Sequence, residues 1–288
     1  MSKKSSDGGI VDPRDIAAED IHWDQDITYG GYLSLDKLLD CQKLRTDAHD
    51  EMMFMIIHQA SELWMKLCLH EIKAAMTEVE HDNLDGTFKM LSRVSRIQSQ
   101  LRLSWSVLST MTPSDYRGFR DELGQSSGFQ SFQYREIEYS LGNKNAELIE
   151  VHRKKPQRYE RLKAALYAPS FYDLCLQLLA RRGFDIPEKY LQRDWSQPYV
   201  ASDSVEAAWA KVYSSTKENW DLYELAEKLV DLEYEFQMWR FSHMKTVERI
   251  IGYSRGTGGT SGVLFLKKAL DLQFFPELWS VRTRLEIS

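Results

Sequence analysis

Cysteine is scarce in this sequence, with only Cys41, Cys68 and Cys175 among its 288 residues. This odd and widely spaced set excludes a disulfide framework, and the lack of a C-x-x-C pair excludes a zinc ribbon. Such sparse cysteine is typical of proteins that are kept in a reducing compartment. We therefore expect a cytoplasmic protein.

Long hydrophobic runs and an excess of positive charge are also missing. No segment offers the roughly 18 uncharged apolar residues of a membrane span, and no apolar stretch follows the basic N-terminus as in a signal peptide. Lysine and arginine total 37 against 43 aspartates and glutamates, a formal net charge of −6. Because no basic field exists to hold nucleic acid or an anionic membrane, we expect neither as a partner.

Alternating runs of β-branched residues are hard to find, and the spacing of apolar residues is helical almost everywhere after residue 48. The spacing predicts three long helices, over 52–76, 88–110 and 220–251. The first half of 52–76 is apolar nearly all round, which predicts a helix buried in the middle of a bundle. Shorter helices are predicted at 133–143, 145–154, 157–166, 169–182, 186–192 and 203–218. The fold class expected is all-α, a helical bundle.

The chain shows no repeat and no linker. Residues 1–20 are polar and patternless, so we expect a disordered N-terminal arm, with residues 21–288 forming a single all-α domain. Three glycine-containing segments are expected to be non-helical: 29–32, 124–129 and 255–262. Glycine lets the backbone approach a ligand closely, so these segments are candidates for function as well as for simple hinges.

His243 stands in a row of large apolar side chains. Within 220–251 the row consists of Leu222, Leu225, Leu229, Leu232, Phe236, Trp239, Val247 and Ile250, at steps of three and four. A buried imidazole needs a partner for each ring nitrogen, and a backbone carbonyl is the ordinary one. His58, in the least polar stretch of the chain, has the same two interpretations, a satisfied core histidine or a functional one.

Taken together, His58 and His243 resemble the histidine ligands of a haem pocket between two helices. They lack the spacing of zinc or di-iron ligands. A haem here would be non-covalent, because no C-x-x-C-H attachment motif is present. The same pair also fits a non-catalytic haem sensor or electron carrier in which both histidines bind iron. A helical protein with a purely structural role is a third possibility.

Two further segments could hold a charged ligand. Tyr116 and Arg120 are four residues apart, so on a helix their side chains would share a face and could clamp a carboxylate. A surface arginine paired with Asp121 or Glu122 is the ordinary alternative. The segment 255–262, RGTGGTSG, offers backbone N–H groups and hydroxyls to an anion but also fits a flexible hinge.

Five segments in this order closely resemble the tryptophan 2,3-dioxygenase family of bacteria. They are TYGGYLSLDKLLDCQ (28–42), DEMMFMIIHQASELWMK (50–66), FRDELGQSSGFQSFQYREIEYSLGNKN (119–145), FQMWRFSHMKTVERIIG (236–252) and RGTGGTSGVLFLKKAL with FFPELW (255–279). The resemblance implies an all-α fold that encloses a b-type haem between helices. It also implies an enzyme that inserts O₂ across the indole C2–C3 bond of L-tryptophan, giving N-formyl-L-kynurenine.

By the same resemblance, His243 is expected to be the proximal ligand of a ferrous, non-covalent haem b, and His58 the distal histidine that meets the indole N–H. Arg120 with Tyr116 would bind the substrate carboxylate, and the hydroxyl of Thr257 would contact the carboxylate and the ammonium. The remaining expected contacts are Phe54 and Leu123 with the indole, Trp105, Ser127 and Gly128 with the haem, and Tyr29 and Tyr32 with the pocket of a neighbouring subunit.

The family resemblance further implies a homotetramer, a dimer of dimers in which the N-terminal segment of one subunit completes the pocket of another. A haem dioxygenase that acts on another indoleamine stays open as an alternative. A comparison of L-tryptophan, D-tryptophan and tryptamine as substrates would separate the two.

Overall fold

The computed structural model describes residues 27–285. This part of the chain contains helices, turns and loops and no β-strand, so the predicted all-α class is confirmed. The chain divides into two compact units, residues 1–43 and 44–288. The predicted boundary at residue 20, between an arm and a domain, lies outside the described residues. None of the helices within 27–285 has the length and apolar character that crossing a membrane requires.

In the first unit, two short helices are described, α2 (Tyr29–Leu33) and α3 (Leu35–Leu39). The expectation that residues 29–32 are non-helical is wrong. Thr28 caps the first helix, since its Oγ1 accepts a hydrogen bond from Gly31 N at 3.1 Å. This cap satisfies one of the donors that a helix start leaves unpaired and helps to offset the helix-weakening effect of two glycines. Neither helix buries any residue.

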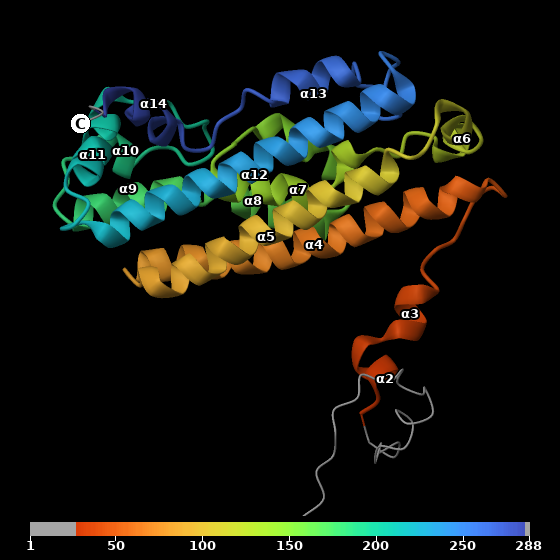
Figure 1. The fold of residues 1–288 in the computed structure, drawn as a ribbon, viewed down its shortest axis with the longest axis horizontal. Coiled ribbons are helices and arrows are strands. Elements are labelled where there is room, and N and C mark those ends of the chain that lie inside the picture. The colour runs from red at the N-terminus through yellow and green to blue at the C-terminus, as the bar shows by residue number, and fades with distance from the viewer. Residues whose placement is uncertain (1–26, 286–288) are drawn as a thin grey trace, which may run out of the picture. The chain divides into compact units, whose positions relative to one another are not determined.

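Three long helices form the body of the second unit: α4 (His49–Glu80), α5 (Leu84–Leu108) and α12 (Trp220–Ile251). They match the three predicted long helices, and α12 has the predicted bounds. They run lengthwise beside one another in Figure 1, and α5 packs against both α4 and α12. Regular apolar stripes at steps of three and four favour this kind of packing.

Shorter helices lie beside these three and at their ends (Figure 1). The α-helices are α6 (Pro113–Arg117), α7 (Phe132–Leu141), α8 (Pro156–Tyr167), α9 (Phe171–Arg181), α10 (Glu188–Leu191), α11 (Asp203–Ser214), α13 (Val263–Ala269) and α14 (Pro276–Arg284), and the 3₁₀ segments are η1 (Arg120–Leu123), η2 (Gly128–Gln130) and η3 (Ala146–His152). The predicted helix at 145–154 is therefore a 3₁₀ segment. Helices α6, α13 and α14 were not predicted, because each is short and begins beside a proline or a glycine loop.

The main core lies among α4, α5, α9, α11 and α12. Leu69, Ile72, Leu91, Leu229 and Leu232 are all buried there, with exposed fractions of 2% or less. Burial of one such side chain stabilises the fold by about 1.5–3 kcal/mol. The stripe on α12 therefore forms the packing seam that its spacing predicts.

The prediction that the first half of α4 is buried is wrong for the single chain. No residue between Met52 and Ala60 is buried, and Met52 and Ile56 are 37% and 46% exposed. The second half of the helix carries most of its buried side chains, including Cys68 and Ile72. One apolar side of the first half is thus left uncovered by the described residues of this chain.

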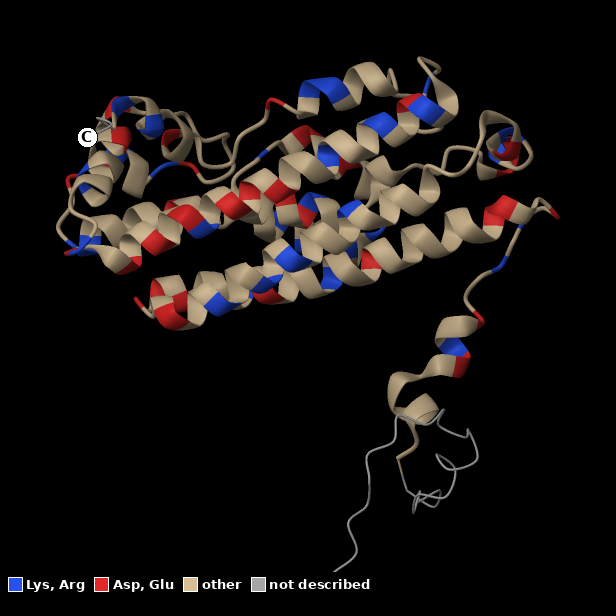
Figure 2. Ribbon diagram, viewed as in Figure 1, with Lys and Arg blue, Asp and Glu red and all other residues tan. Residues whose placement is uncertain are grey.

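Charge along α12 follows the helix dipole. Figure 2 shows its acidic residues mainly in the first half and its basic residues mainly in the second. Acidic groups near a helix N-terminus and basic groups near its C-terminus are each favoured by the partial charges of the helix ends. Near the middle, Arg240 Nη2 binds Glu138 Oε1 of α7 at 2.8 Å, and both side chains are buried.

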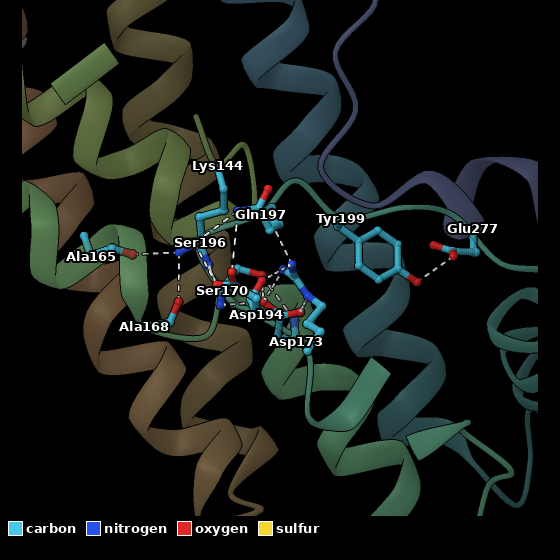
Figure 3. Close-up of polar contacts among 11 residues, drawn as sticks. Lys144, Ala165, Ala168, Ser170, Asp173, Asp194, Ser196, Gln197, Tyr199 and Glu277 are labelled. Carbon is cyan, nitrogen blue, oxygen red and sulfur yellow. Dashed lines mark hydrogen bonds and ion pairs between the residues drawn. The ribbon is translucent and has the colours of Figure 1, made fainter. Parts of the chain in front are cut away.

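A second group of buried charges lies around the end of α8 (Figure 3). Lys144 is 1% exposed, and its Nζ donates to the carbonyl oxygens of Ala165 at 2.6 Å and Ala168 at 2.9 Å. These carbonyls belong to the helix terminus, where no intrahelical donor is available. Burial lowers the pKa of Lys144 to about 7, although the charge of Asp173 opposes this shift.

We predict that Lys144 makes the stability of the fold increase above neutral pH. With a pKa of about 7 in the folded state and near 10.4 when unfolded, the unfolded chain binds more protons between these values. The free energy of unfolding should rise by about 2 kcal/mol from pH 7 to pH 9 on account of this group.

Urea unfolding at both pH values would measure the rise, and Lys144→Met should reduce it by that amount. Exposed Lys163 on α8 offers the control, since Lys163→Met should leave the pH dependence as it is. An identical pH dependence in Lys144→Met and the wild type would contradict the prediction.

Candidate functional site

The two histidines singled out in the sequence contact the same tryptophan. His58 lies on α4, Trp105 on α5 and His243 on α12. The Trp105 ring stacks on His243 with centroids 4.5 Å apart and meets His58 edge-on at 6.1 Å. The packing of α5 against both neighbouring helices therefore brings together two imidazoles that are 185 positions apart in the chain.

A backbone carbonyl fixes the tautomer of His58. Its Nδ1 lies 2.7 Å from the carbonyl oxygen of Phe54, one turn earlier on α4. Because a carbonyl can only accept, Nδ1 carries the proton and Nε2 keeps a lone pair in the neutral ring. Burial lowers the pKa of His58, with the Phe54 hydrogen bond and the charge of Glu62 opposing it. A neutral ring with Nε2 as an acceptor is the form expected at pH 7.

His243 is also neutral at pH 7. Burial, helped by the neighbouring His58, lowers its pKa to about 4, and no hydrogen bond contributes to this shift. Its ring is held by aromatic contacts with Trp105 and with Trp239, whose centroid is 5.7 Å away. The stacked indole covers the face of the imidazole and leaves the lone pair free, because that pair lies in the ring plane. Metal binding requires such a deprotonated nitrogen.

An apolar wall adjoins the histidines. Its buried members are Trp105, Leu108, Met111, Phe119 and Ile250, and Phe54, Tyr116, Leu123, Met53, Ile57, Trp239 and Ile251 pack against them. Four residues named from the sequence therefore gather here: Phe54, Trp105, Tyr116 and Leu123. Sequence reasoning missed Phe119, which follows a turn without any apolar periodicity. It also missed Trp239 as a site residue, although its place one turn before His243 on the same stripe was a usable signal.

Tyr116 and Arg120 contact each other, but the single helix predicted to join them is wrong. Helix α6 ends at Arg117, a turn follows, and η1 begins at Arg120. Burial raises the pKa of Tyr116, while the charge of Arg120 and a hydrogen bond with it act to lower the pKa. Arg120 makes no ion pair within residues 27–285, so the alternative pairing with Asp121 or Glu122 is not seen.

The glycine-rich loop 255–262 closes onto the segment that contains Arg120. Arg120 Nη2 donates to the carbonyl oxygen of Arg255 at 2.9 Å, and Thr257 Oγ1 donates to the carbonyl oxygen of Ser126 at 2.5 Å. A Cβ atom on Gly258 would lie only 2.8 Å from Cβ of Ser127. Close approach of the loop to the Ser127 side chain therefore explains glycine at position 258.

The remaining residues named from the sequence are Ser127, Gly128, Tyr29 and Tyr32. Ser127 caps η2 through a hydrogen bond that its Oγ accepts from Phe129 N at 3.3 Å, and Gly128 begins this 3₁₀ segment with open space where a side chain would be. Tyr29 and Tyr32 lie in the first unit and are 77% and 78% exposed. The structure describes them within that unit alone, so their place in a pocket stays a prediction.

The donor set fits a metal that is carried by a macrocycle. Within residues 27–285, no three His, Cys, Asp or Glu side chains are grouped to hold a metal ion by themselves. A haem iron needs a single protein imidazole, because the porphyrin supplies its other ligands. His243 offers that imidazole, and the buried N–H groups of Trp105 and Trp239 have no hydrogen-bond partner among the described residues. Aromatic and aliphatic walls complete a setting suited to haem.

Comparison with known proteins gives a family. The family model described as tryptophan 2,3-dioxygenase matches residues 17–166 and 210–285. A tryptophan 2,3-dioxygenase of Bacillus cereus (strain ZK / E33L) is 57% identical over 272 residues, covering 94% of this chain and 98% of the relative. Tryptophan 2,3-dioxygenases of Geobacillus thermodenitrificans and of a Polaromonas species are 56% and 52% identical, covering 92% and 98% of this chain and 95% and 97% of their own lengths.

We predict that Gly258→Ala separates the loop 255–262 from Ser127, because the added methyl group would overlap Cβ and Oγ of that serine. The hydrogen bond between Thr257 and Ser126 should then be lost, and Arg255 should become more accessible. Limited proteolysis with trypsin, which cuts after arginine, would show faster cleavage at Arg255.

The double variant Gly258→Ala with Ser127→Gly should return cleavage to the wild-type rate, since it removes the overlapping atoms. Unchanged cleavage in Gly258→Ala alone would show that the two loops are not held by this contact.

Proposed function

Since this chain belongs to the tryptophan 2,3-dioxygenase family, we propose that it inserts both atoms of O₂ across the indole C2–C3 bond of L-tryptophan. The product is N-formyl-L-kynurenine, and the reaction is the first step of tryptophan catabolism through kynurenine. The observation that carries the proposal is the meeting of two neutral imidazoles at Trp105 beside a contact pair of Tyr116 and Arg120. One imidazole can bind iron while the other faces a substrate.

The cofactor of the proposal is haem b, which is held non-covalently through His243. When bound, it supplies the ferrous iron that activates dioxygen. His243 suits this role because its low pKa keeps the ring nitrogen deprotonated and its aromatic contacts keep the ring fixed. Trp105, Ser127 and Gly128 would border the haem, with the unpaired indole N–H of Trp105 available to an anionic propionate.

His58 is assigned to the substrate indole. Its Nε2 keeps a lone pair because Nδ1 donates to Phe54, so Nε2 can accept the indole N–H. Its role is to bind and orient, and Phe54 and Leu123 would contact the indole ring in the same apolar wall. A site built to accept this N–H discriminates against phenylalanine, which would leave the acceptor unpaired.

Arg120 is assigned to the substrate carboxylate, with the Tyr116 hydroxyl beside it. A guanidinium has five N–H donors, and the Arg255 carbonyl uses one nitrogen, Nη2, so donors remain for a carboxylate. The hydroxyl oxygen of Thr257 can accept a hydrogen bond from the substrate ammonium while it donates to Ser126. Both charged groups of the amino acid then have a hydrogen-bond partner, which a partly desolvated zwitterion requires.

The proposal also includes a homotetramer, a dimer of dimers, in which Tyr29 and Tyr32 complete a neighbour's pocket. The absence of any buried residue in α2 and α3 supports it, as do the exposed Met52 and Ile56 on α4. Apolar side chains of this kind gain free energy when another surface covers them. A cytoplasmic location is proposed as well, supported by the buried thiols of Cys68 and Cys175, neither of which forms a disulfide.

We predict that the purified protein binds haem and forms N-formylkynurenine when it is reduced and supplied with L-tryptophan and O₂. His243→Ala should lose the haem and all activity, because the iron loses its one protein ligand. The Soret absorbance reports the haem and the absorbance of the product reports the reaction. His70→Ala, at an exposed histidine of α4, serves as the control that keeps both.

Product formation by His243→Ala with its haem intact would contradict the assignment of His243 as the haem ligand. A six-coordinate, low-spin ferrous spectrum in the wild type would instead support a bis-histidine haem protein. Faster turnover of tryptamine than of L-tryptophan would support a dioxygenase of another indoleamine.

We predict that Arg120→Gln raises the KM for L-tryptophan by about 30-fold. This corresponds to roughly 2 kcal/mol, the lower end for a desolvated charge pair, chosen because Arg120 is partly exposed. Steady-state kinetics would measure it, and Arg117→Gln, an exposed arginine of α6, is the matched control. The KM for tryptamine, which lacks the carboxylate, should be almost the same in wild type and Arg120→Gln. An unchanged KM for L-tryptophan would place the carboxylate elsewhere.

A further inference from the structure

Tyr134 of α7 packs against the tryptophan that contacts the candidate haem ligand. Its ring centroid is 5.3 Å from that of Trp239 on α12, and the Trp239 centroid is 5.7 Å from that of His243. Within residues 27–285, the ring of Tyr134 contacts the rings of Phe236 and Trp239 and not the imidazole. Trp239 and His243 are one turn apart on α12, so they share a helix face. An effect of Tyr134 on the imidazole must therefore pass through the indole of Trp239.

The hydroxyl group of Tyr134 is bound to a buried ion pair. It donates to Glu138 Oε1 at 3.0 Å and accepts from Arg240 Nε at 3.4 Å. Glu138 and Arg240 are 3% and 4% exposed, and Arg240 Nη2 donates to the same carboxylate oxygen at 2.8 Å. Burial raises the pKa of Tyr134 to about 12, so the hydroxyl keeps the proton that it donates. Groups on two helices, α7 and α12, thus hold the phenol ring.

The ion pair itself is held by further hydrogen bonds. Asn143 Nδ2 donates to Glu138 Oε1 at 3.1 Å, and Arg240 Nη1 donates to the carbonyl oxygen of Leu272 at 3.0 Å. A buried charged group that loses one of its partners is strongly destabilised, so both side chains are confined to this arrangement. The position of the Tyr134 hydroxyl is fixed with them.

The His243 imidazole depends on neighbouring rings for its orientation. A ligand imidazole must keep the lone pair of one nitrogen directed at the metal, and rotation about its side-chain torsions would turn that pair away. Trp105 stacks on His243 with centroids 4.5 Å apart, and Trp239 packs against it at an interplanar angle of 32°. The two indoles also contact each other, with centroids 6.0 Å apart. Of these two indoles, Trp239 is the one that packs against Tyr134.

A purely structural role is the ordinary alternative for a tyrosine in a helix bundle, and Tyr139 on the same helix has such a role. Tyr139 is 0% exposed, packs with aliphatic side chains of η3 and α8, and donates its hydroxyl to the carbonyl oxygen of Asn145 at 2.6 Å. Among the described residues, it makes no ring contact with α12. Tyr134 and Tyr139 are therefore a matched pair, and only Tyr134 contacts Trp239.

We propose that Tyr134 is a positioning residue for the haem ligand. The ion pair of Glu138 and Arg240 fixes the phenol ring through its hydroxyl. The ring holds the indole of Trp239, and the indole keeps the His243 imidazole from turning. This inference rests on the proposed function, because it takes His243 as the residue that binds haem iron.

The rate of haem release tests the proposal. Haem-loaded full-length protein is mixed with an excess of apomyoglobin, and the Soret band follows the transfer. We expect Tyr134→Leu to release haem about fivefold faster than the wild type, the factor that corresponds to roughly 1 kcal/mol for one aromatic pair. Tyr139→Leu, which removes an equally large ring from the same helix, should release haem at the wild-type rate. Equal rates in the two leucine variants would overturn the proposal.

A second pair of variants decides the question if a leucine variant does not fold. Tyr134→Phe keeps the ring against Trp239 but loses the hydrogen bonds with the ion pair, so haem release should be about twofold faster than in the wild type. Tyr139→Phe should match the wild type. The Fe–His stretching band in resonance Raman spectra of the reduced proteins should shift or broaden in the Tyr134 variants and in neither Tyr139 variant. A loss of stability alone would not move this band. A wild-type rate and a wild-type band in Tyr134→Phe would refute the positioning role.

Failure of this inference can be told apart from failure of the proposed function. Both readouts need bound haem but no turnover, so they test Tyr134 even in a protein that forms no N-formylkynurenine. That outcome would refute the dioxygenase alone. Haem retained by His243→Ala would refute the ligand assignment, and the positioning role of Tyr134 with it.

Discussion

The packing of α5 between α4 and α12 is the constraint on which the candidate site depends. Each of the three helices supplies one ring: His58, Trp105 and His243. The three rings meet because apolar stripes elsewhere on the same helices, with Ile72, Leu91 and Leu229 fully buried, set the rotation of each helix about its axis. A rotation by one residue, about 100°, would turn an imidazole away from the others. The core thus determines the chemistry, although Ile72, Leu91 and Leu229 belong to the main core and not to the apolar wall of the site.

Polar contacts far from the histidines fix α12 in the same way. The ion pair of Arg240 with Glu138 ties the middle of α12 to α7. About two turns earlier, Glu233 accepts hydrogen bonds from Phe274 N at 2.6 Å and Trp279 Nε1 at 2.8 Å. Burial raises the pKa of Glu233, and these donors oppose the shift. Removing one partner of such a buried group costs more free energy than the intact contact contributes to stability. These contacts therefore specify one orientation of α12.

Much of this arrangement could be predicted from the sequence, and the failures have physical causes. His243 could be found because it interrupts an apolar stripe on α12. The period of that stripe alone shows that the histidine lies on the same helix face as the apolar side chains. Helix α2 was missed because its two glycines have poor helix propensity, which the cap at Thr28 helps to offset. Burial around Met52 was misjudged because an apolar helix face shows only that something covers it, and the partner can be another chain. The contact of Tyr116 with Arg120 was right for the wrong reason, since a turn rather than a helix brings them together.

The glycine-rich loop shows how a weak signal in sequence becomes specific in structure. RGTGGTSG fits an anion-binding loop or a hinge equally well, because glycine permits both. In the structure, a Cβ on Gly262 would lie 2.5 Å from the carbonyl oxygen of Ser254, and its φ is +61°, so this position excludes other residues on two grounds. Gly258 is excluded from having a side chain by Ser127. Close contacts of Gly258 with the Ser127 side chain and of Gly262 with the Ser254 carbonyl therefore fix the loop. The Arg255 carbonyl oxygen, in the same loop, accepts a hydrogen bond from Arg120 Nη2. The arginine that would bind a carboxylate is thus oriented by the loop before any ligand arrives, which lowers the entropy cost of binding.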